Sequence, residues 1–553
     1  MFTRQKIIIR QLAVTGLFLI SPWIAGAQEV GNIQANSVIS RSENTKLCLN
    51  FPKRVGVRPG HSFFQYIAIS GSPEKVMVEN LPEGLNQNGL TLVGRLSTIG
   101  SYTINISATN QQGMVKGQME IICGEQIALT PPLGWSSWNY CGKNVSDAKI
   151  RAMAKAMVDQ GLIQYGYSYV NIDDGWQGQR DAKTGALLPN EHFPDMKAMC
   201  DYVHSLGLKI GIYSTPWKTS YAGYTGGSAD TADGKILNKG GDKYGAFEFH
   251  VQDAKQFAEW GFDYLKYDWN PNTIKHTQKM SDALRHSGRD IVFSLSNTTP
   301  FQEVNEFSRL AQVWRTTGDI IDAFKPSTNM PHFYHSIVEC GFMDADRWGP
   351  YVGPGHWADP DMLVVGNIGL GADQIRESDL TFSEQKVHLT QWSLCASPLL
   401  LGCDISRLNN DILGLLKNEE VLAVNQDILG KRARLIKSYG SLVYVSRKNP
   451  KDSGEYRELQ IWSKALQDGS KVVALFNLSD EGPKEVGFAF SDIGLSGEQN
   501  LRDLWQHKDL GKYSTGFSAV IPSRDVVMII IQNSSNKYIK KEREQPTKGN
   551  NYE

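Results

Sequence analysis

Hydrophobic and polar positions alternate in blocks through the middle of the chain, from Leu133 to about Ile405. Short apolar runs bounded by turn residues predict eight strands, and several are followed by runs with apolar residues at helical spacing. The predicted strands are Leu133–Trp138, Tyr167–Asp174, Lys209–Ser214, Tyr264–Asp268, Ile291–Ser296, Val313–Thr316, Gly355–Leu363 and Leu399–Cys403, and the predicted helices are Asp147–Leu162, Asp195–Leu206, Val251–Trp260, Thr277–Ser287 and Ser383–Leu394. This alternation favours a (β/α)8 TIM barrel, with a doubly wound sheet as the alternative.

Short strands between turn residues flank this region on both sides. From Glu29 to about Glu125 they predict a small β-sandwich, which resembles the immunoglobulin-like modules of secreted bacterial enzymes. From about Leu429 a second, antiparallel β-sandwich is predicted, with strands at Ser441–Arg447, Leu459–Lys464, Lys471–Leu478 and Val526–Ile531. The predicted organisation is a signal peptide at 1–27, an Ig-like β-sandwich at 28–125, the barrel at 126–428, the C-terminal β-sandwich at 429–532 and a polar, disordered tail at 533–553.

The first residues have the pattern of a secretory signal peptide. Arg4, Lys6 and Arg10 precede an apolar run from Leu12 to Ile24, and a small-residue site ends at Ala27. The apolar run is shorter than the roughly 18 to 20 residues that a membrane span needs. We expect cleavage after Ala27 and an exported protein, periplasmic or extracellular.

The overall composition is that of a soluble multidomain protein with almost no net charge. The chain has 553 residues, too many for a single core, and a net charge of −1. This balance gives no electrostatic basis for binding nucleic acid or an anionic membrane, and it suits a neutral ligand. The sequence does not determine the oligomeric state.

The cysteines leave their pairing open. Seven cysteines leave at least one thiol unpaired. Cys48 and Cys123 bracket the N-terminal β region, and a disulfide or two buried free thiols both fit the pattern. Because no Cys-x-x-Cys pair or Cys/His cluster occurs, a structural zinc is not expected.

Aspartates lie at or near the ends of several predicted barrel strands. Asp173 and Asp174 end the second strand, Asp268 ends the fourth, and Asp319 follows the sixth. Each alone is equally compatible with capping the next helix, but together they gather carboxylates at the mouth of a barrel. Paired carboxylates at such a mouth are typical of glycoside hydrolysis.

Two of these aspartates have neighbours that suit a retaining glycosidase. Lys266, two positions before Asp268, points to the same face and is expected to keep that carboxylate ionised, as a nucleophile requires. Asp319, preceded by Gly318 and four residues after Arg315, is the predicted acid/base. The sequence has no zinc motif and no nucleophile elbow, so neither a catalytic metal nor a serine triad is expected, although Asp173, Asp174 and Asp361 leave a hard cation as an open alternative.

Seven motifs in one order resemble glycoside hydrolase family 27, the α-galactosidase and α-N-acetylgalactosaminidase family. They are Thr130–Trp138, Val170–Trp176, Lys209–Tyr213, Tyr264–Asp268, Trp314–Asp319, Trp357–Leu363 and Asn425–Asp427. The resemblance covers about 130 to 530 and implies a retaining double displacement on a carbohydrate substrate, with no cofactor. It implies Asp268 as nucleophile, Asp319 as acid/base, and sugar contacts from Trp138, Asp173, Asp174, Tyr213, Lys266 and Arg315. Trp176 and Trp217 are candidates for the pocket, with core packing as the favoured role.

The chain departs from the family pattern at two places. Asn270 stands where many members have a disulfide-forming cysteine, and Ser296 stands where α-galactosidases offer a glutamate to the sugar 2-hydroxyl. A small residue there resembles the N-acetylgalactosaminidase branch, unless another loop supplies the contact. The expected activity is therefore an α-galactosidase, with α-N-acetylgalactosaminidase, β-L-arabinopyranosidase and a sugar-binding protein on an inactive barrel as alternatives.

Overall fold

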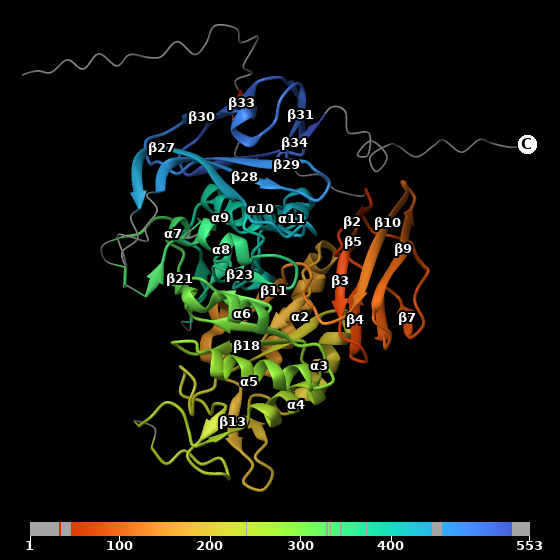
Figure 1. The fold of residues 1–553 in the computed structure, drawn as a ribbon, viewed down its shortest axis with the longest axis vertical. Helices are drawn as coiled ribbons and strands as arrows, with labels where there is room; N and C mark the ends of the chain where they lie inside the picture. Colours follow the sequence, from red (N-terminus) through yellow and green to blue (C-terminus); the bar gives the residue numbers. More distant parts are fainter. Residues whose placement is uncertain are drawn as a thin grey trace, which may run out of the picture.

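The structure, a computed structural model, consists of a central barrel and two β modules packed on it (Figure 1). The N-terminal module is drawn in red and orange, and the C-terminal β-sandwich is drawn in blue. It describes residues 33–34, 46–238, 241–327, 330–331, 333–342, 345–371, 374–444 and 456–533. The predicted signal peptide and the polar tail after Asn533 lie outside the described residues.

Eight parallel strands form the barrel, and each follows its sequence neighbour around the sheet. They are β11 (Leu133–Ser136), β12 (Tyr169–Asn171), β15 (Lys209–Ser214), β18 (Tyr264–Asp268), β19 (Val292–Ser296), β20 (Val313–Arg315), β23 (Trp357–Asp359) and β26 (Leu399–Leu401). β26 pairs with β11, and Leu363 bridges to Leu401, which closes the ring. The predicted (β/α)8 barrel is confirmed, and all eight predicted strands are present.

The seventh strand is shorter than the predicted Gly355–Leu363. It ends at Asp359, because Pro360 has no N–H to give to the sheet and Asp361 has a positive φ of 91°. Its extended path resumes at Leu363, the residue that closes the barrel.

Helices cover the outside of the barrel. They are α1 (Trp138–Cys141), α2 (Asp147–Asp159), α3 (Met196–Ser205), α4 (His250–Trp260), α5 (Ile274–Arg285), α6 (Val304–Leu310), α7 (Ile337–Phe342), α8 (Ala345–Trp348), α9 (Phe382–Leu394), α10 (Asn410–Leu416) and α11 (Glu419–Asn425). Side-chain caps explain several starts, among them Ser146 at α2 and the capping box of Thr381 and Glu384 at α9. No helix among the described residues is long and apolar enough to cross a membrane.

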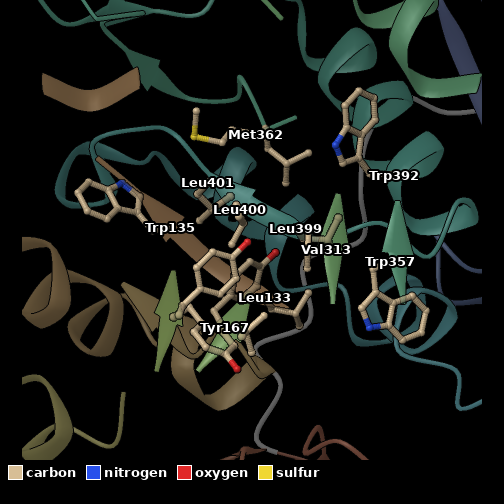
Figure 2. Packing of buried hydrophobic residues seen from close by; sticks show 14 of the residues in the cluster. Leu133, Trp135, Tyr167, Val313, Trp357, Met362, Trp392, Leu399, Leu400 and Leu401 are labelled. Atoms are coloured by element: carbon tan, nitrogen blue, oxygen red, sulfur yellow. The ribbon is translucent and has the colours of Figure 1, made fainter. Parts of the chain in front are cut away.

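Tryptophans and leucines fill the barrel and its surroundings (Figure 2). Trp135, Trp357 and Trp392 are fully buried, and each indole N–H donates to a backbone carbonyl at 2.7 to 2.8 Å. Because a buried N–H without a partner is costly, these bonds fix the orientation of each ring.

The C-terminal sandwich packs a six-stranded sheet against a three-stranded one. The first contains β27 (Arg434–Tyr444), β28 (Tyr456–Ala465), β29 (Lys471–Asn477), β34 (Asp525–Asn533), β31 (Gln499–Asp503) and β32 (Lys508–Tyr513), and the second contains β1 (Ile33–Gln34), β33 (Gly516–Ile521) and β30 (Lys484–Ala489). Along β29, Val472 and Ala474 join the barrel core, whereas Val473 and Leu475 join the sandwich core. The strand is therefore apolar on both faces, as its unbroken hydrophobic run requires.

The N-terminal module has its own hydrophobic core between two sheets. One sheet contains β3 (Arg54–Val57), β10 (Gly113–Cys123), β9 (Gly100–Asn110) and β6 (Lys75–Glu79), the other β4 (Ser62–Tyr66), β8 (Thr91–Arg95) and β7 (Leu85–Asn88), and β2 (Cys48–Leu49) pairs with β5 (Ile69–Ser70). Cys48 and Cys123 are free thiols rather than a disulfide. The assignment to the immunoglobulin class stays a prediction.

The N-terminal module docks on the end of the barrel where the strands begin. Arg58 donates from its backbone N–H and from Nη1 to Asp290, at 2.9 and 3.0 Å, and His61 lies 3.0 Å from the same carboxylate. Asp290 lies just before β19, so this contact is at the opposite end of the strand from Ser296. The other end of the barrel stays open.

Candidate active site

A cavity of about 170 Å³ lies at the C-terminal ends of the barrel strands. All nine residues singled out from the sequence line it, namely Trp138, Asp173, Asp174, Tyr213, Lys266, Asp268, Ser296, Arg315 and Asp319. The lining also includes Asp361, which was considered from the sequence only as an alternative cation ligand. The other lining residues were not singled out, namely Asn139, Tyr221, Asn297, Ile320, Ile321, Tyr334, Met362 and Leu370. The barrel thus brings together side chains from segments that are far apart in the sequence.

Asp268 ends β18 and is 8% exposed. Its Oδ2 accepts a hydrogen bond from the Tyr213 hydroxyl at 3.0 Å, and its Oδ1 accepts one from the side-chain amide of Asn297. Burial raises the pKa of Asp268, while the charge of Lys266 acts in the opposite direction. The expected influence of Lys266 is present, but burial outweighs it.

Lys266, on the fourth strand, contacts Asp173, just after the second strand, through its side chain. Its Nζ donates to Asp173 Oδ2 at 2.7 Å, and the Ser136 hydroxyl donates to the same oxygen at 3.2 Å. Burial lowers the pKa of Lys266, but Asp173 and Asp268 outweigh it and the net shift is upward. Lys266 is therefore held as a cation between two carboxylates.

Asp174 is 2% exposed and keeps one oxygen without a hydrogen bond in the part of the chain that the structure describes. Its Oδ2 accepts from the backbone N–H of Ala222 at 2.8 Å, and Oδ1 is the oxygen without a partner. Burial raises the pKa of Asp174 to about 6. A buried acceptor without a partner on a cavity wall is suited to a ligand hydroxyl.

Arg315 lies between two carboxylates on the far wall. Its Nη2 donates to Asp319 Oδ1 at 3.2 Å, and its Nη1 lies 3.0 Å from Asp361 Oδ1. Asp319 begins the short strand β21 (Asp319–Ile320), and its side chain is 56% exposed. The two candidate catalytic carboxyls therefore have contrasting surroundings, since Asp268 is buried and Asp319 faces solvent.

Asp361 contributes to the site although it was considered from the sequence only as an alternative cation ligand. It is buried, accepts from the backbone N–H of Ile320 at 2.9 Å, and adopts a positive φ of 91°. Burial raises its pKa to about 7, with Asp319 acting in the same direction and Arg315 against it. A positive φ cannot be read from a sequence, so this placement had no clear signal.

The aromatic residues divide between the cavity and the core. Trp138 begins α1, is partly buried and lines the cavity. Trp176 is fully buried and donates its indole N–H to the carbonyl of Tyr213 at 2.8 Å, which agrees with the core role favoured for it. Trp217 is 5% exposed and packs against Tyr221, with ring centroids 5.1 Å apart.

Ser296 ends β19 on the cavity wall, and Asn297 follows it in the turn. Asn297 was not singled out from the sequence, yet it contacts Asp268 directly. Its position directly after a barrel strand was the only available signal.

Comparisons with known proteins show which family the chain belongs to. A family model described as α-galactosidase A matches residues 130–427, and one described as the α-galactosidase C-terminal β-sandwich domain matches residues 456–531. The chain is 34% identical over 429 residues to α-galactosidase 2 of Arabidopsis thaliana, covering 76% of this chain and 93% of that protein. It is 38% identical over 427 residues to α-galactosidase A of Cellvibrio japonicus, covering 73% of this chain and 92% of that protein.

A solved structure from Bacteroides fragilis extends the likeness to more of the chain. It aligns with a TM-score of 0.76 and 31% identity, over 88% of this chain and 98% of that one. The family model spans the whole barrel, from the first strand to the last, and so includes the strands around the cavity. The chain therefore belongs to the α-galactosidase family and is a glycoside hydrolase.

Proposed function

We propose that this protein is a retaining exo-acting α-galactosidase, with Asp268 as nucleophile and Asp319 as acid/base. The observation that carries the proposal is the pairing of a buried, doubly hydrogen-bonded Asp268 with a solvent-facing Asp319 on one cavity. The relatives named α-galactosidases favour galactose as the sugar.

The proposed reaction has two displacements. In the first, Asp268 attacks the anomeric carbon while Asp319 gives its proton to the departing glycosidic oxygen, which leaves a glycosyl ester on Asp268. In the second, Asp319 removes a proton from water as that water attacks the same carbon, and Asp268 is released as a carboxylate. Both carboxyls return to their starting protonation states, and the configuration at the carbon is retained.

The wall around Asp174 supports recognition of a terminal sugar. Asp173 and Asp174 present acceptor oxygens, and Lys266 presents donors, so together they are matched to neighbouring hydroxyl groups. Trp138 offers an aromatic face to the apolar side of the ring, and Arg315 offers donors beside the acid/base.

A second candidate is α-N-acetylgalactosaminidase, and Ser296 is the observation that favours it. Its small side chain lies on the cavity wall where a larger residue would take up space beside the sugar. The experiment is to compare hydrolysis of p-nitrophenyl α-galactoside and p-nitrophenyl α-N-acetylgalactosaminide. Faster release from the galactoside supports the main proposal, and faster release from the acetamido sugar replaces it.

Substitution of the proposed nucleophile tests the mechanism directly. Asp268→Asn should lower kcat by at least about a thousandfold, because the amide cannot form the glycosyl ester. Galactose binding, measured by isothermal titration calorimetry, should remain within a few fold. Wild-type turnover in this variant would exclude Asp268 as the nucleophile, and a wild-type protein that binds sugar but hydrolyses no glycoside would favour a binding protein.

We also propose export of the protein, supported by the basic and apolar pattern of residues 1–27. Expression of the full chain in a bacterial host, followed by fractionation and N-terminal sequencing, tests this. The expected product begins at Gln28 and lies outside the cytoplasm.

A further inference from the structure

The carboxylate of Asp268 is held on both of its oxygens by different strands of the barrel. Tyr213, on β15, donates its hydroxyl to Oδ2 at 3.0 Å, and Asn297, after β19, donates its side-chain amide to Oδ1. Because an ionised carboxylate only accepts hydrogen bonds, the NH2 group of Asn297 must be the side that faces it. The two donors therefore contact Asp268 from the strands on either side of β18.

The turn that carries Asn297 is tied to its neighbours. Asn272 donates to the carbonyl of Ser296 at 3.2 Å and accepts from the Thr299 hydroxyl at 3.1 Å. The backbone N–H of Thr299 donates to the carbonyl of Arg315 at 2.9 Å. These bonds hold the turn on both sides of Asn297, so the backbone from which its side chain extends is fixed in position.

The backbone at Asn297 also suits the residue found there. Its φ is 64°, in the left-handed region, where asparagine is one of the few tolerated side chains other than glycine. In this conformation the side-chain amide of Asn297 contacts Asp268. The residue with the unfavourable backbone conformation, Asn297, is therefore also the residue that donates a hydrogen bond to Asp268.

We propose that Asn297 is a positioning residue of the glycosidase reaction, which orients the Asp268 carboxylate and stabilises its charged form before it attacks. The inference rests on the proposed function, because that function assigns Asp268 as the nucleophile. With a donor on each oxygen, the carboxylate cannot rotate without breaking one bond, so its attacking oxygen stays aligned.

The charges around Asp268 affect its protonation, so the loss of the Asn297 donor should be measurable as a change in the pH at which Asp268 ionises. The titratable groups that face it are Lys266, Tyr213, Tyr221, Asp173, Asp174 and Asp319. Lys266 favours the ionised form of Asp268, whereas burial and the surrounding carboxylates disfavour it. Removal of a neutral donor from this balance should make Asp268 protonate at a higher pH.

The test is the pH dependence of kcat/KM for Asn297→Ala and Asn297→Asp, on whichever p-nitrophenyl glycoside the wild-type enzyme hydrolyses. Asn297→Ala should lower kcat/KM at the optimum about ten- to a hundredfold, the size expected when a hydrogen bond to a charged group is lost. Its acid limb should move to higher pH, because that limb reports ionisation of the nucleophile in the free enzyme. Asn297→Asp should move the limb further, because it sets a second carboxylate beside Asp268.

Thr298→Ala is the matched control, because Thr298 is exposed and follows Asn297 in the same turn. It should keep the wild-type rate and pH profile. A lower rate in the Asn297 variants with an unmoved acid limb would overturn the proposal, and so would rates within twofold of wild type. If Asn297→Ala does not fold, the isosteric Asn297→Asp decides alone. An active Asp268→Asn would instead overturn the proposed function.

Discussion

Asp174, which we propose binds the sugar, shows how a single buried residue can lower the stability of the fold. It is buried, one of its oxygens has no hydrogen bond among the described residues, and burial raises its pKa to about 6. In the unfolded chain the same carboxyl has a pKa near 3.9. The native state therefore binds the proton more tightly, and stability falls as the pH rises from about 4 to about 6.

Asp174→Asn should stabilise the protein at pH 7.5 by about 3 kcal/mol, because it removes the cost of ionising a buried group. The gain should disappear near pH 4, where the carboxyl is protonated in both states. Chemical unfolding at pH 7.5 and at pH 4 measures the change in the free energy of unfolding. In the same variant kcat/KM should fall. A gain of equal size at pH 4 would contradict the explanation.

Asp173→Asn is the control for this prediction. Asp173 accepts a hydrogen bond from Lys266 at 2.7 Å, so this substitution removes the carboxylate that pairs directly with a largely buried ammonium. This variant should be less stable at pH 7.5, the opposite sign from Asp174→Asn.

Single residues were predicted well where they end a strand and poorly where the backbone is unusual. The strand-ending Asp268 and the nearby Lys266 were found from the sequence, because alternation fixes which side chains share a face. Asn297 and Asp361 have positive φ values of 64° and 91°. A sequence pattern contains no signal for such conformations at residues other than glycine.

At the scale of elements, strands of the C-terminal sandwich with a long apolar run were predicted, whereas two polar edge strands and the short apolar strand β33 were missed. β29 was predicted at Lys471–Leu478 and observed at Lys471–Asn477. β32 (Lys508–Tyr513) and β30 were not predicted, because β32 is mostly exposed and β30 contains Lys484, Glu485 and Gly487. Edge strands need only one buried face, so their periodicity is weak.

Two loop elements carry exposed aromatic rings beside the cavity. Tyr221, in the loop after β15, lines the cavity and is 52% exposed. Phe333 is 53% exposed and packs on Tyr334, whose strand β22 (Tyr334–His335) pairs Tyr334 with Asp319. Under the proposed function Asp319 stands beside the departing oxygen, so rings next to it would lie on the leaving-group side.

Tyr221→Ala and Phe333→Ala should therefore lower kcat/KM several-fold for an α-galactosyl disaccharide, whose leaving sugar can stack on these rings. Hydrolysis of α-galactosyl fluoride should hardly change, because fluoride has no ring to contact. Steady-state kinetics gives kcat/KM for the disaccharide and for the fluoride, and the ratio of the two values is compared between each variant and the wild type. Val251→Ala is the control, since Val251 is an exposed apolar residue on α4 that does not line the cavity. Equal losses on both substrates would contradict a leaving-group role.

At the scale of the whole molecule, the N-terminal module is attached through partly buried charges far from the cavity. The side chains of Arg58 and Asp290 are only 7% and 14% exposed. Burial lowers the pKa of Arg58, and Asp290 opposes that shift. Breaking such a pair leaves a charge without compensation at the interface.

Asp290→Ala should lower the free energy of unfolding by about 3 kcal/mol and leave kcat/KM unchanged at 25 °C. Thermal unfolding and steady-state kinetics measure the two quantities. Glu125→Ala provides the comparison, because Glu125 pairs with Arg285 across the same interface but is 77% exposed. Its effect should stay within about 1 kcal/mol. A changed kcat/KM in Asp290→Ala would mean that the module communicates with the cavity.

The barrel was predictable from the sequence, whereas the way it closes was not. β19 and β18 share five residue pairs, whereas among the described residues the seventh and eighth strands meet through one bridge, between Leu363, beyond the end of β23, and Leu401 of β26. Side chains of α9 complete the join, because Trp392 donates to the carbonyl of Asp361 and His388 accepts from the N–H of Val364. These contacts depend on the spatial position of α9, which hydrophobic periodicity does not give.

This narrow join has a consequence for the motions of the native state. Local opening is least costly where the fewest backbone bonds must break, so the barrel should open first between Leu363 and Leu401. The amide protons of Leu363 and Gly402, which donate to Leu400 and Leu363, should then exchange with solvent sooner than those of β18. Each such opening would make Asp361 more mobile. Because Arg315 contacts both Asp361 and Asp319, the position of the Asp319 carboxyl would also change. Slow opening of the barrel and the orientation of the Asp319 carboxyl would then depend on the same contacts.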